Sequence, residues 1–65
     1  MWFLVTVEMQ DGDSYRCVAD ASSTYYAEKA AIQHYKNDGH YVDNAEAEMF
    51  NTFEHGDISD YTVVD

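Results

Sequence analysis

The sequence predicts an α+β fold, a small two-layer domain with an N-terminal antiparallel hairpin, one main helix over about 23–38, and one or two further strands. Two patterns indicate this fold. Apolar and polar residues alternate over 2–9 and again over 14–19, which is the period of a half-buried strand. The alanine-rich segment that follows has its apolar residues at the spacing of an amphipathic helix. The expected order is ββαββ, in which 43–55 is either a strand or a second short helix.

The expected hairpin brings two apolar strand faces together. In the first strand this face consists of Phe3, Val5, Val7 and Met9. Residues 11–13 supply the turn, because Gly12 accepts the positive φ that a tight hairpin requires. A three-residue loop there gives the pairs Met9 with Tyr15, Val7 with Cys17 and Val5 with Ala19. In this register we expect Val5, Val7 and Cys17 to be buried against the alanines of the helix.

The helix has recognisable ends and two different faces. Ser22 or Ser23 can cap its first turn, and Gly39 suits its C-terminal end. The face expected to point inward consists of Tyr26, Ala27, Ala30, Ala31, His34 and Tyr35. Tyr25 and Ile32 fall on the opposite, polar side, where they are either ordinary surface residues or a contact with another chain.

Residues 43–55 fit two interpretations. A helix would begin with a capping box of Asp43 and Glu46 and would end near Gly56. A strand would instead place Ala45, Ala47, Met49 and Phe53 inward and Glu46, Glu48 and Thr52 outward. Local propensity favours the helix, but we favour the strand because it gives a four-stranded sheet with fewer unpaired edges. Residues 58–64 are expected to form the closing strand.

The composition indicates one folded and strongly acidic domain over residues 1–65. There are 13 Asp and Glu but only three Lys and Arg, for a net charge of −10. Apolar residues at 46% and aromatic residues at 15% supply a small core, which argues against disorder. This charge argues against direct nucleic-acid binding through phosphates and against contact with an anionic membrane. Because so small a domain cannot enclose a deep pocket, we expect no enzymatic activity.

The sequence contains no spacing typical of a catalytic, metal or cofactor site, and we expect none of these. The three histidines form no i, i+4 pair on one helix, and no calcium-binding loop occurs. Cys17 is the only cysteine, so an intramolecular disulfide is impossible. Since no secretion signal or membrane span is recognisable either, we expect a cytoplasmic protein, in the host cell if a phage encodes it.

The carboxylates are the remaining functional signal. On a strand, Glu46 and Glu48 would share one face about 6–7 Å apart, the same order of spacing as consecutive phosphates of a nucleic-acid strand. The sequence therefore predicts a non-catalytic protein that presents negative charge to a basic, nucleic-acid-binding partner. It resembles nucleic-acid mimics in general character, since these are small, acidic and often encoded by viruses or mobile elements. The residues expected to meet the partner are Glu46, Glu48, Glu54, Asp57, Asp60, Trp2, Tyr25 and Ile32.

A second hypothesis rests on the aromatic and apolar residues outside the expected core. Trp2 falls on the strand face opposite Phe3 and Val5, where it either covers the far side of a thin sheet or anchors a partner. In this alternative the chain is a structural or assembly subunit that forms a homodimer or larger assembly through Trp2, Tyr25 and Ile32. Its acidity would then serve only solubility or adaptation to high salt.

Overall fold

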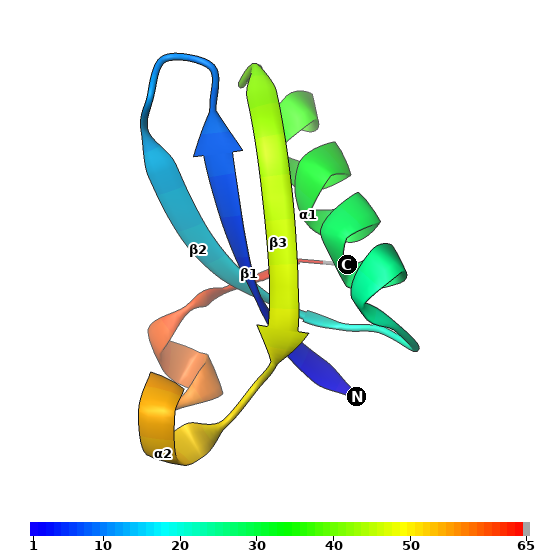
Figure 1. The fold of residues 1–65 in the computed structure, drawn as a ribbon, viewed down its shortest axis with the longest axis vertical. Coiled ribbons are helices and arrows are strands. Elements are labelled where there is room, and N and C mark those ends of the chain that lie inside the picture. Colours follow the sequence, from blue (N-terminus) through cyan, green and yellow to red (C-terminus); the bar gives the residue numbers. More distant parts are fainter. Residues whose placement is uncertain (65) are drawn as a thin grey trace.

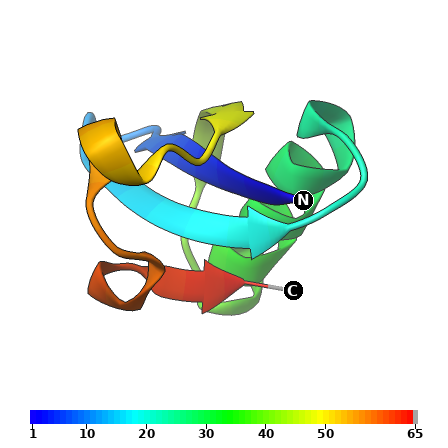
Figure 2. The same cartoon turned by 90° about the horizontal axis from the view of Figure 1, so that it is seen from below.

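Four strands form one sheet in the order β3-β1-β2-β4, and the computed structural model describes residues 1–64. The elements in chain order are β1 (Trp2–Met9), β2 (Ser14–Asp20), α1 (Thr24–Asn37), β3 (Val42–Met49), α2 (Thr52–His55), the 3-10 turn η1 (Ile58–Asp60) and β4 (Thr62–Val64) (Figure 1). Figure 2 shows α1 on one side of the sheet and α2 with η1 on the other. The predicted α+β fold is therefore confirmed, with α2 and η1 between the last two strands.

The hairpin of β1 and β2 forms, but its register differs from the predicted one by two residues. The predicted pairs are wrong and are replaced by Val7 with Tyr15, Val5 with Cys17 and Phe3 with Ala19. The turn lies at 10–12, one residue earlier than predicted, because the Met9 N–H donates to the carbonyl of Asp13 at 2.8 Å and the Gly12 N–H donates to the carbonyl of Met9 at 3.0 Å. A shift of two residues keeps every side chain on its face of the sheet, so the expected faces are retained.

The main core lies between the sheet and α1. The predicted burial of Val5, Val7 and Cys17 is confirmed, since none of these residues is exposed. The core cluster consists of Phe3, Val5, Val7, Met9, Cys17, Ala19, Ala27, Ala31, Tyr35 and Val64. Ala27 and Ala31 have small side chains, which allows α1 to lie close to the strands.

The helix begins and ends close to where the sequence predicts. Ser23 is its N-cap and accepts a hydrogen bond from the Tyr26 N–H at 3.4 Å. At the other end Gly39 follows the C-cap residue Asp38. Its φ of +89° lets the chain turn away from the helix. Tyr26 was expected to point inward, but it is 57% exposed and packs edge-to-face on Tyr25 at 5.2 Å. The buried residues of the helix are Ala27, Ala31 and Tyr35. They form a stripe that begins about 100° around the helix from Tyr26.

The strand interpretation of 43–55 is confirmed for its first part, and a short helix follows. Ala45 and Ala47 of β3 pack against the core as expected. Met49 and Phe53 were expected inward, but they are 61% and 99% exposed. Met49 keeps the side of α1, since it pairs with Phe3, but it is the last residue of an edge strand. The alternation ends there, because Asn51 caps α2 by accepting from the Phe53 N–H at 2.9 Å. A period of two residues cannot be carried from a strand into a helix.

The closing strand is shorter than expected and runs parallel to its neighbour. Residues 58–60 form η1 instead of strand, and only Thr62–Val64 pair with β2. Val64 reaches the main core on the α1 side. The intervening segment 50–61 crosses the other side of the sheet, as Figure 2 shows. There Leu4 and Val18 are buried although they point away from α1.

The outer edge of β3 is partly occupied by α1. Glu28 of α1 accepts a hydrogen bond from the Ala47 N–H at 3.0 Å. In a sheet this N–H would otherwise point away from β1 toward an additional strand. The carboxylate therefore joins the helix to the edge of the sheet.

Candidate interaction surface

Three glutamates from two neighbouring strands share the side of the sheet opposite α1. Glu46 pairs with Thr6, Glu48 pairs with Leu4, and Glu8 lies opposite the β3 residue two positions before Glu46. Since cross-strand partners point to the same face, we call Glu8, Glu46 and Glu48 the acidic face. Strand geometry places consecutive members about 6–8 Å apart. The spacing expected for Glu46 and Glu48 therefore applies, and β1 adds a third carboxylate.

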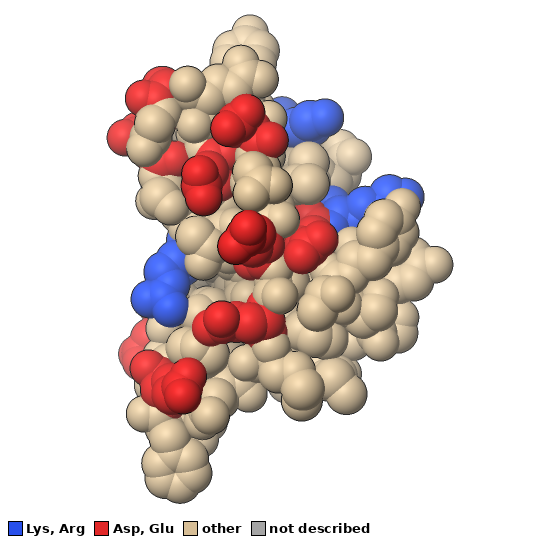
Figure 3. All heavy atoms as spheres, viewed as in Figure 1, with Lys and Arg blue, Asp and Glu red and all other residues tan. Residues whose placement is uncertain are grey.

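One basic residue, Arg16, shares this side of the sheet, but in the described residues it forms no ion pair with the acidic face. Within residues 1–64, no Lys or Arg forms an ion pair with a carboxylate. Arg16 lies on the same side of the sheet, opposite Thr6, but its guanidinium is over the Tyr61 ring at 5.7 Å. Lys29 lies over the Tyr25 ring at 5.6 Å. Figure 3 shows acidic side chains along β3, from the β1–β2 connection to the α2 end, with basic side chains on either side of this row.

Glu48 has a structural contact in addition to its charge. Its Oε1 lies 2.6 Å from Nε2 of His55, whose side chain is only 7% exposed. The other ring nitrogen of His55, Nδ1, accepts a hydrogen bond from the Asn51 N–H at 3.0 Å. A nitrogen that accepts carries no proton, so the neutral ring holds its proton on Nε2 and donates it to Glu48. Glu48 therefore tethers α2 to the sheet.

The remaining predicted acidic residues extend the negative surface at the α2 end. Glu54 is exposed on α2, and Asp57 and Asp60 are exposed at η1. The Asp60 carboxylate accepts from the Asp57 N–H at 3.2 Å, which holds the turn. α2 and η1 lie on the same side of the sheet as the acidic face (Figure 2). The structure thus places Glu46 and Glu48 on this side of the sheet, and the short elements that carry or border the other three predicted carboxylates lie on the same side.

The three predicted apolar residues are not brought together. Trp2 is half-buried. It lies two residues before Leu4 in β1, so it is on the same side of the sheet as the acidic face. Tyr25 is exposed and Ile32 half-buried, and both belong to α1 on the opposite side. A single surface formed by Trp2, Tyr25 and Ile32 does not exist in this fold.

Two functional candidates escaped the sequence interpretation. The place of Glu8 beside Glu46 depends on the pairing of β1 with β3, which the alternation of residues along one strand does not reveal. Phe53 was assigned to the core, and the signal that could have corrected this is Asn51, a residue that favours helix N-caps. The strand interpretation is right as far as Met49, whereas the helix is confined to Thr52–His55, and Asp43 and Glu46 lie in β3 instead of capping a helix.

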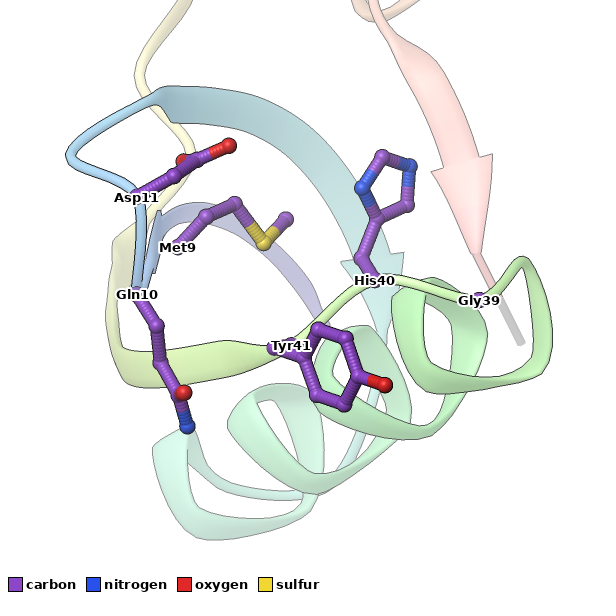
Figure 4. Close-up of a pocket in the computed structure, with 6 residues that line it drawn as sticks. All are labelled: Met9, Gln10, Asp11, Gly39, His40 and Tyr41. Atoms are coloured by element: carbon purple, nitrogen blue, oxygen red, sulfur yellow. The ribbon is translucent and has the colours of Figure 1, made fainter.

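Two adjoining hollows lie at the end of the molecule remote from α2. They have volumes of about 400 and 490 Å³ and share Gln10, Gly39, His40 and Tyr41. Figure 4 shows Met9 and Asp11 across from His40, with the Tyr41 ring pointing away from them. Both hollows are open to solvent, and no group of three or more metal-ligating side chains occurs in the part of the chain that the structure describes.

Cys17 is not placed to act as a nucleophile. Burial raises its pKa from the ordinary 9.0 to about 11, although a hydrogen bond from Tyr35 opposes this shift. Burial likewise raises the pKa of Tyr35 from 10.0 to about 12. Both groups are therefore protonated at neutral pH, and the thiol lacks the thiolate that nucleophilic chemistry requires.

Comparisons with known proteins found no match, since no protein-family model, curated protein or solved structure is significantly similar to this chain. In residues 1–64, neither helix has the length and apolar character to span a membrane.

Proposed function

We propose that this chain is a non-catalytic acidic binding protein whose acidic face meets a basic, nucleic-acid-binding partner. In its specific form it is a nucleic-acid mimic that inhibits a DNA- or RNA-binding enzyme. The observation that carries this proposal is the set of Glu8, Glu46 and Glu48, which lie side by side without a Lys or Arg partner in residues 1–64. Inhibitors of this kind include those that phages direct against restriction or CRISPR enzymes.

Electrostatics supports this function over mere solubility. Carboxylates about 6–8 Å apart on a strand pair repel one another and lower the stability of the folded state. Arg16 lies on the same side and relieves part of that repulsion, but it forms no ion pair with these carboxylates in residues 1–64, and Lys29 belongs to α1 on the other side. A partner with a row of basic side chains would remove the repulsion on binding and would gain attraction at the same time. The resulting association is fast and strongly dependent on salt.

The first experiment tests competition. Basic proteins that bind the chain at low salt are recovered from a host lysate, purified and mixed with labelled DNA or RNA. We expect the chain to displace the nucleic acid, because both ligands occupy the same basic surface. A partner that binds both ligands at once, or partners that are neutral or acidic, would contradict the proposal.

The second experiment tests the acidic face itself with single-charge variants. Glu46→Gln should lower the association rate roughly two- to fivefold at low salt, because one attractive charge is removed. Asp38→Asn is the matched control, since it removes one charge at the C-cap of α1, on the other layer of the molecule. Stopped-flow measurements at several salt concentrations separate the two. Equal effects of both variants would show that only net charge matters.

A further inference from the structure

The most exposed large apolar side chain in the described residues is that of Phe53, which is 99% exposed. The next is Tyr41 at 78%, but a tyrosine has a hydroxyl that water can solvate, whereas a phenylalanine has no polar atom. The ring of Phe53 therefore remains entirely in water in the isolated chain. Its burial by a partner would release water from nearly the whole ring, which is the strongest gain that one side chain of this type can offer.

The structure holds the backbone that carries this ring in a fixed place. A helix of only four residues is not stable alone, because helix formation begins with a costly first turn. α2 is held by the Asn51 cap at one end and by His55 at the other, and His55 is bonded to both Asn51 and Glu48. Phe50 packs against His55 and Tyr61 at ring distances of 5.5 and 5.9 Å. The backbone at Phe53 is thus already ordered in the free chain, so binding loses little backbone conformational entropy there.

The surroundings of Phe53 are acidic. Glu54 is the next residue, and Glu48 is joined through His55 to the same short helix. Asp57 follows α2 after one residue, and Lys and Arg are absent from the described chain after β3 begins, so the basic group near this end is Arg16, which lies over the Tyr61 ring. A matching partner surface must therefore combine an apolar pocket for the ring with Lys or Arg around it. An aromatic anchor inside a charged rim is typical of interface hot spots.

We infer that Phe53 is the anchor of the interface, and that it inserts into an apolar pocket rimmed by basic residues on the partner of the acidic face. This inference rests on the proposed function and adds to it the origin of specificity. The carboxylates control how fast the partner arrives, and Phe53 controls how long it stays. Trp2, the anchor that the sequence suggested, is half-buried and has less free surface to offer.

The test uses two labelled helical peptides of equal length and equal lysine number. One peptide carries alanine between the lysines and the other carries leucine, so they differ only in apolar surface. Fluorescence anisotropy at low salt gives both dissociation constants. We expect the wild-type chain to bind the leucine peptide about tenfold more tightly, and Phe53→Ala to abolish this preference.

Tyr41→Ala is the matched control because it removes another exposed ring, at the hollows remote from α2. It should leave the preference for the leucine peptide unchanged. Phe53→Ala is not expected to unfold the protein, because the ring makes no buried contact and the Asn51 cap bonds to the backbone. A melting temperature equal to that of wild type confirms this for each variant.

Three results would overturn the inference, and a fourth would overturn only the proposed function. A preference that survives Phe53→Ala, or that Tyr41→Ala also removes, excludes Phe53 as the anchor. Light scattering that finds a dimer in wild type and a monomer in Phe53→Ala identifies the occupant as a second copy instead. If Glu8→Gln with Glu46→Gln weakens neither peptide, the acidic face has no role in binding, whatever the result at Phe53.

Discussion

The two faces of β1 differ although they belong to the same eight residues. On the side of α1, Phe3, Val5 and Val7 are all buried. On the other side only Leu4 is buried, while Glu8 is exposed. The first face is covered along its length by an alanine-rich helix, and the second is covered only where segment 50–61 crosses it. Strand alternation thus lets one strand supply both the core and a charged surface.

The two sides of β1 therefore contribute to different free energies, one to that of folding and the other to that of association with a partner. The α1 side stabilises the fold through burial, so substitutions there should act on folding. The acidic side adds repulsion at the surface, so substitutions there should act weakly on folding and strongly on association. The following experiments test this separation, beginning with the largest expected effect.

Val7→Asp is expected to unfold the protein. The substitution places a charge in a site with no exposed surface and no basic partner, which can cost several kcal/mol in a small domain. Thr6→Asp is the matched control because it lies one residue earlier on the other face, and it should cost about 1 kcal/mol. Circular dichroism with thermal melting distinguishes them. A cooperative fold in Val7→Asp would contradict the assignment of the two faces.

His55→Ala should destabilise the protein by about 2 kcal/mol, because it removes two hydrogen bonds and leaves the Asn51 N–H without its acceptor. The loss should be concentrated in α2, where amide hydrogen exchange should become much faster. His40→Ala is the control, since the side chain of this exposed histidine has no hydrogen bond to the backbone in the described structure like the one between His55 and the Asn51 N–H. Equal effects of the two variants would contradict the tether between α2 and the sheet.

Alkaline pH should weaken the α1 side of the molecule. The pKa values of Cys17 and Tyr35 are raised in the folded state, to about 11 and about 12. Their contribution is therefore complete below pH 9, where the unfolded chain also keeps these protons, and it is lost as pH rises toward the folded values. Urea unfolding at pH 7, 9 and 10.5 should show this decline, and Cys17→Ala should reduce it. A flat profile would mean that the two groups are not buried in solution.

Glu46→Gln should have the smallest effect on folding. Removing one of three neighbouring charges is expected to raise stability by at most about 0.5 kcal/mol at low salt. The gain should vanish in ~0.5 M NaCl, where wild type should also be more stable, because salt screens the repulsion. Melting temperatures over a salt series measure both. A loss of stability at low salt would show that Glu46 has a favourable partner and would remove it from the acidic face.

Much of the fold could be predicted because periodicity is a local property. Val5, Val7 and Cys17 were assigned to the correct face even though the register was wrong by two residues, since a shift of two preserves the face. The parallel pairing of β4 with β2 was beyond this reasoning. It depends on how segment 50–61 crosses the sheet, which is a matter of tertiary packing.

The candidate site was predictable in its charge but not in its arrangement. Glu46 and Glu48 were placed on one face by alternation alone, and the structure keeps them there. The contact of Glu48 with His55 joins two elements with a turn between them, and no spacing rule relates such residues. Phe53 was misplaced because its hydrophobicity suggests burial, whereas a small domain has too little core to bury every aromatic residue.

The bond between Glu28 and the Ala47 N–H has a consequence for the behaviour of many copies together. An open strand edge can pair with the same edge of another molecule, and such pairing can grow into aggregates. At low salt the net charge of −10 keeps copies apart, but concentrated salt removes this protection. A hydrogen bond of 3.0 Å acts at contact distance, where salt has little effect. The edge of β3 therefore stays guarded when charge repulsion no longer separates the molecules.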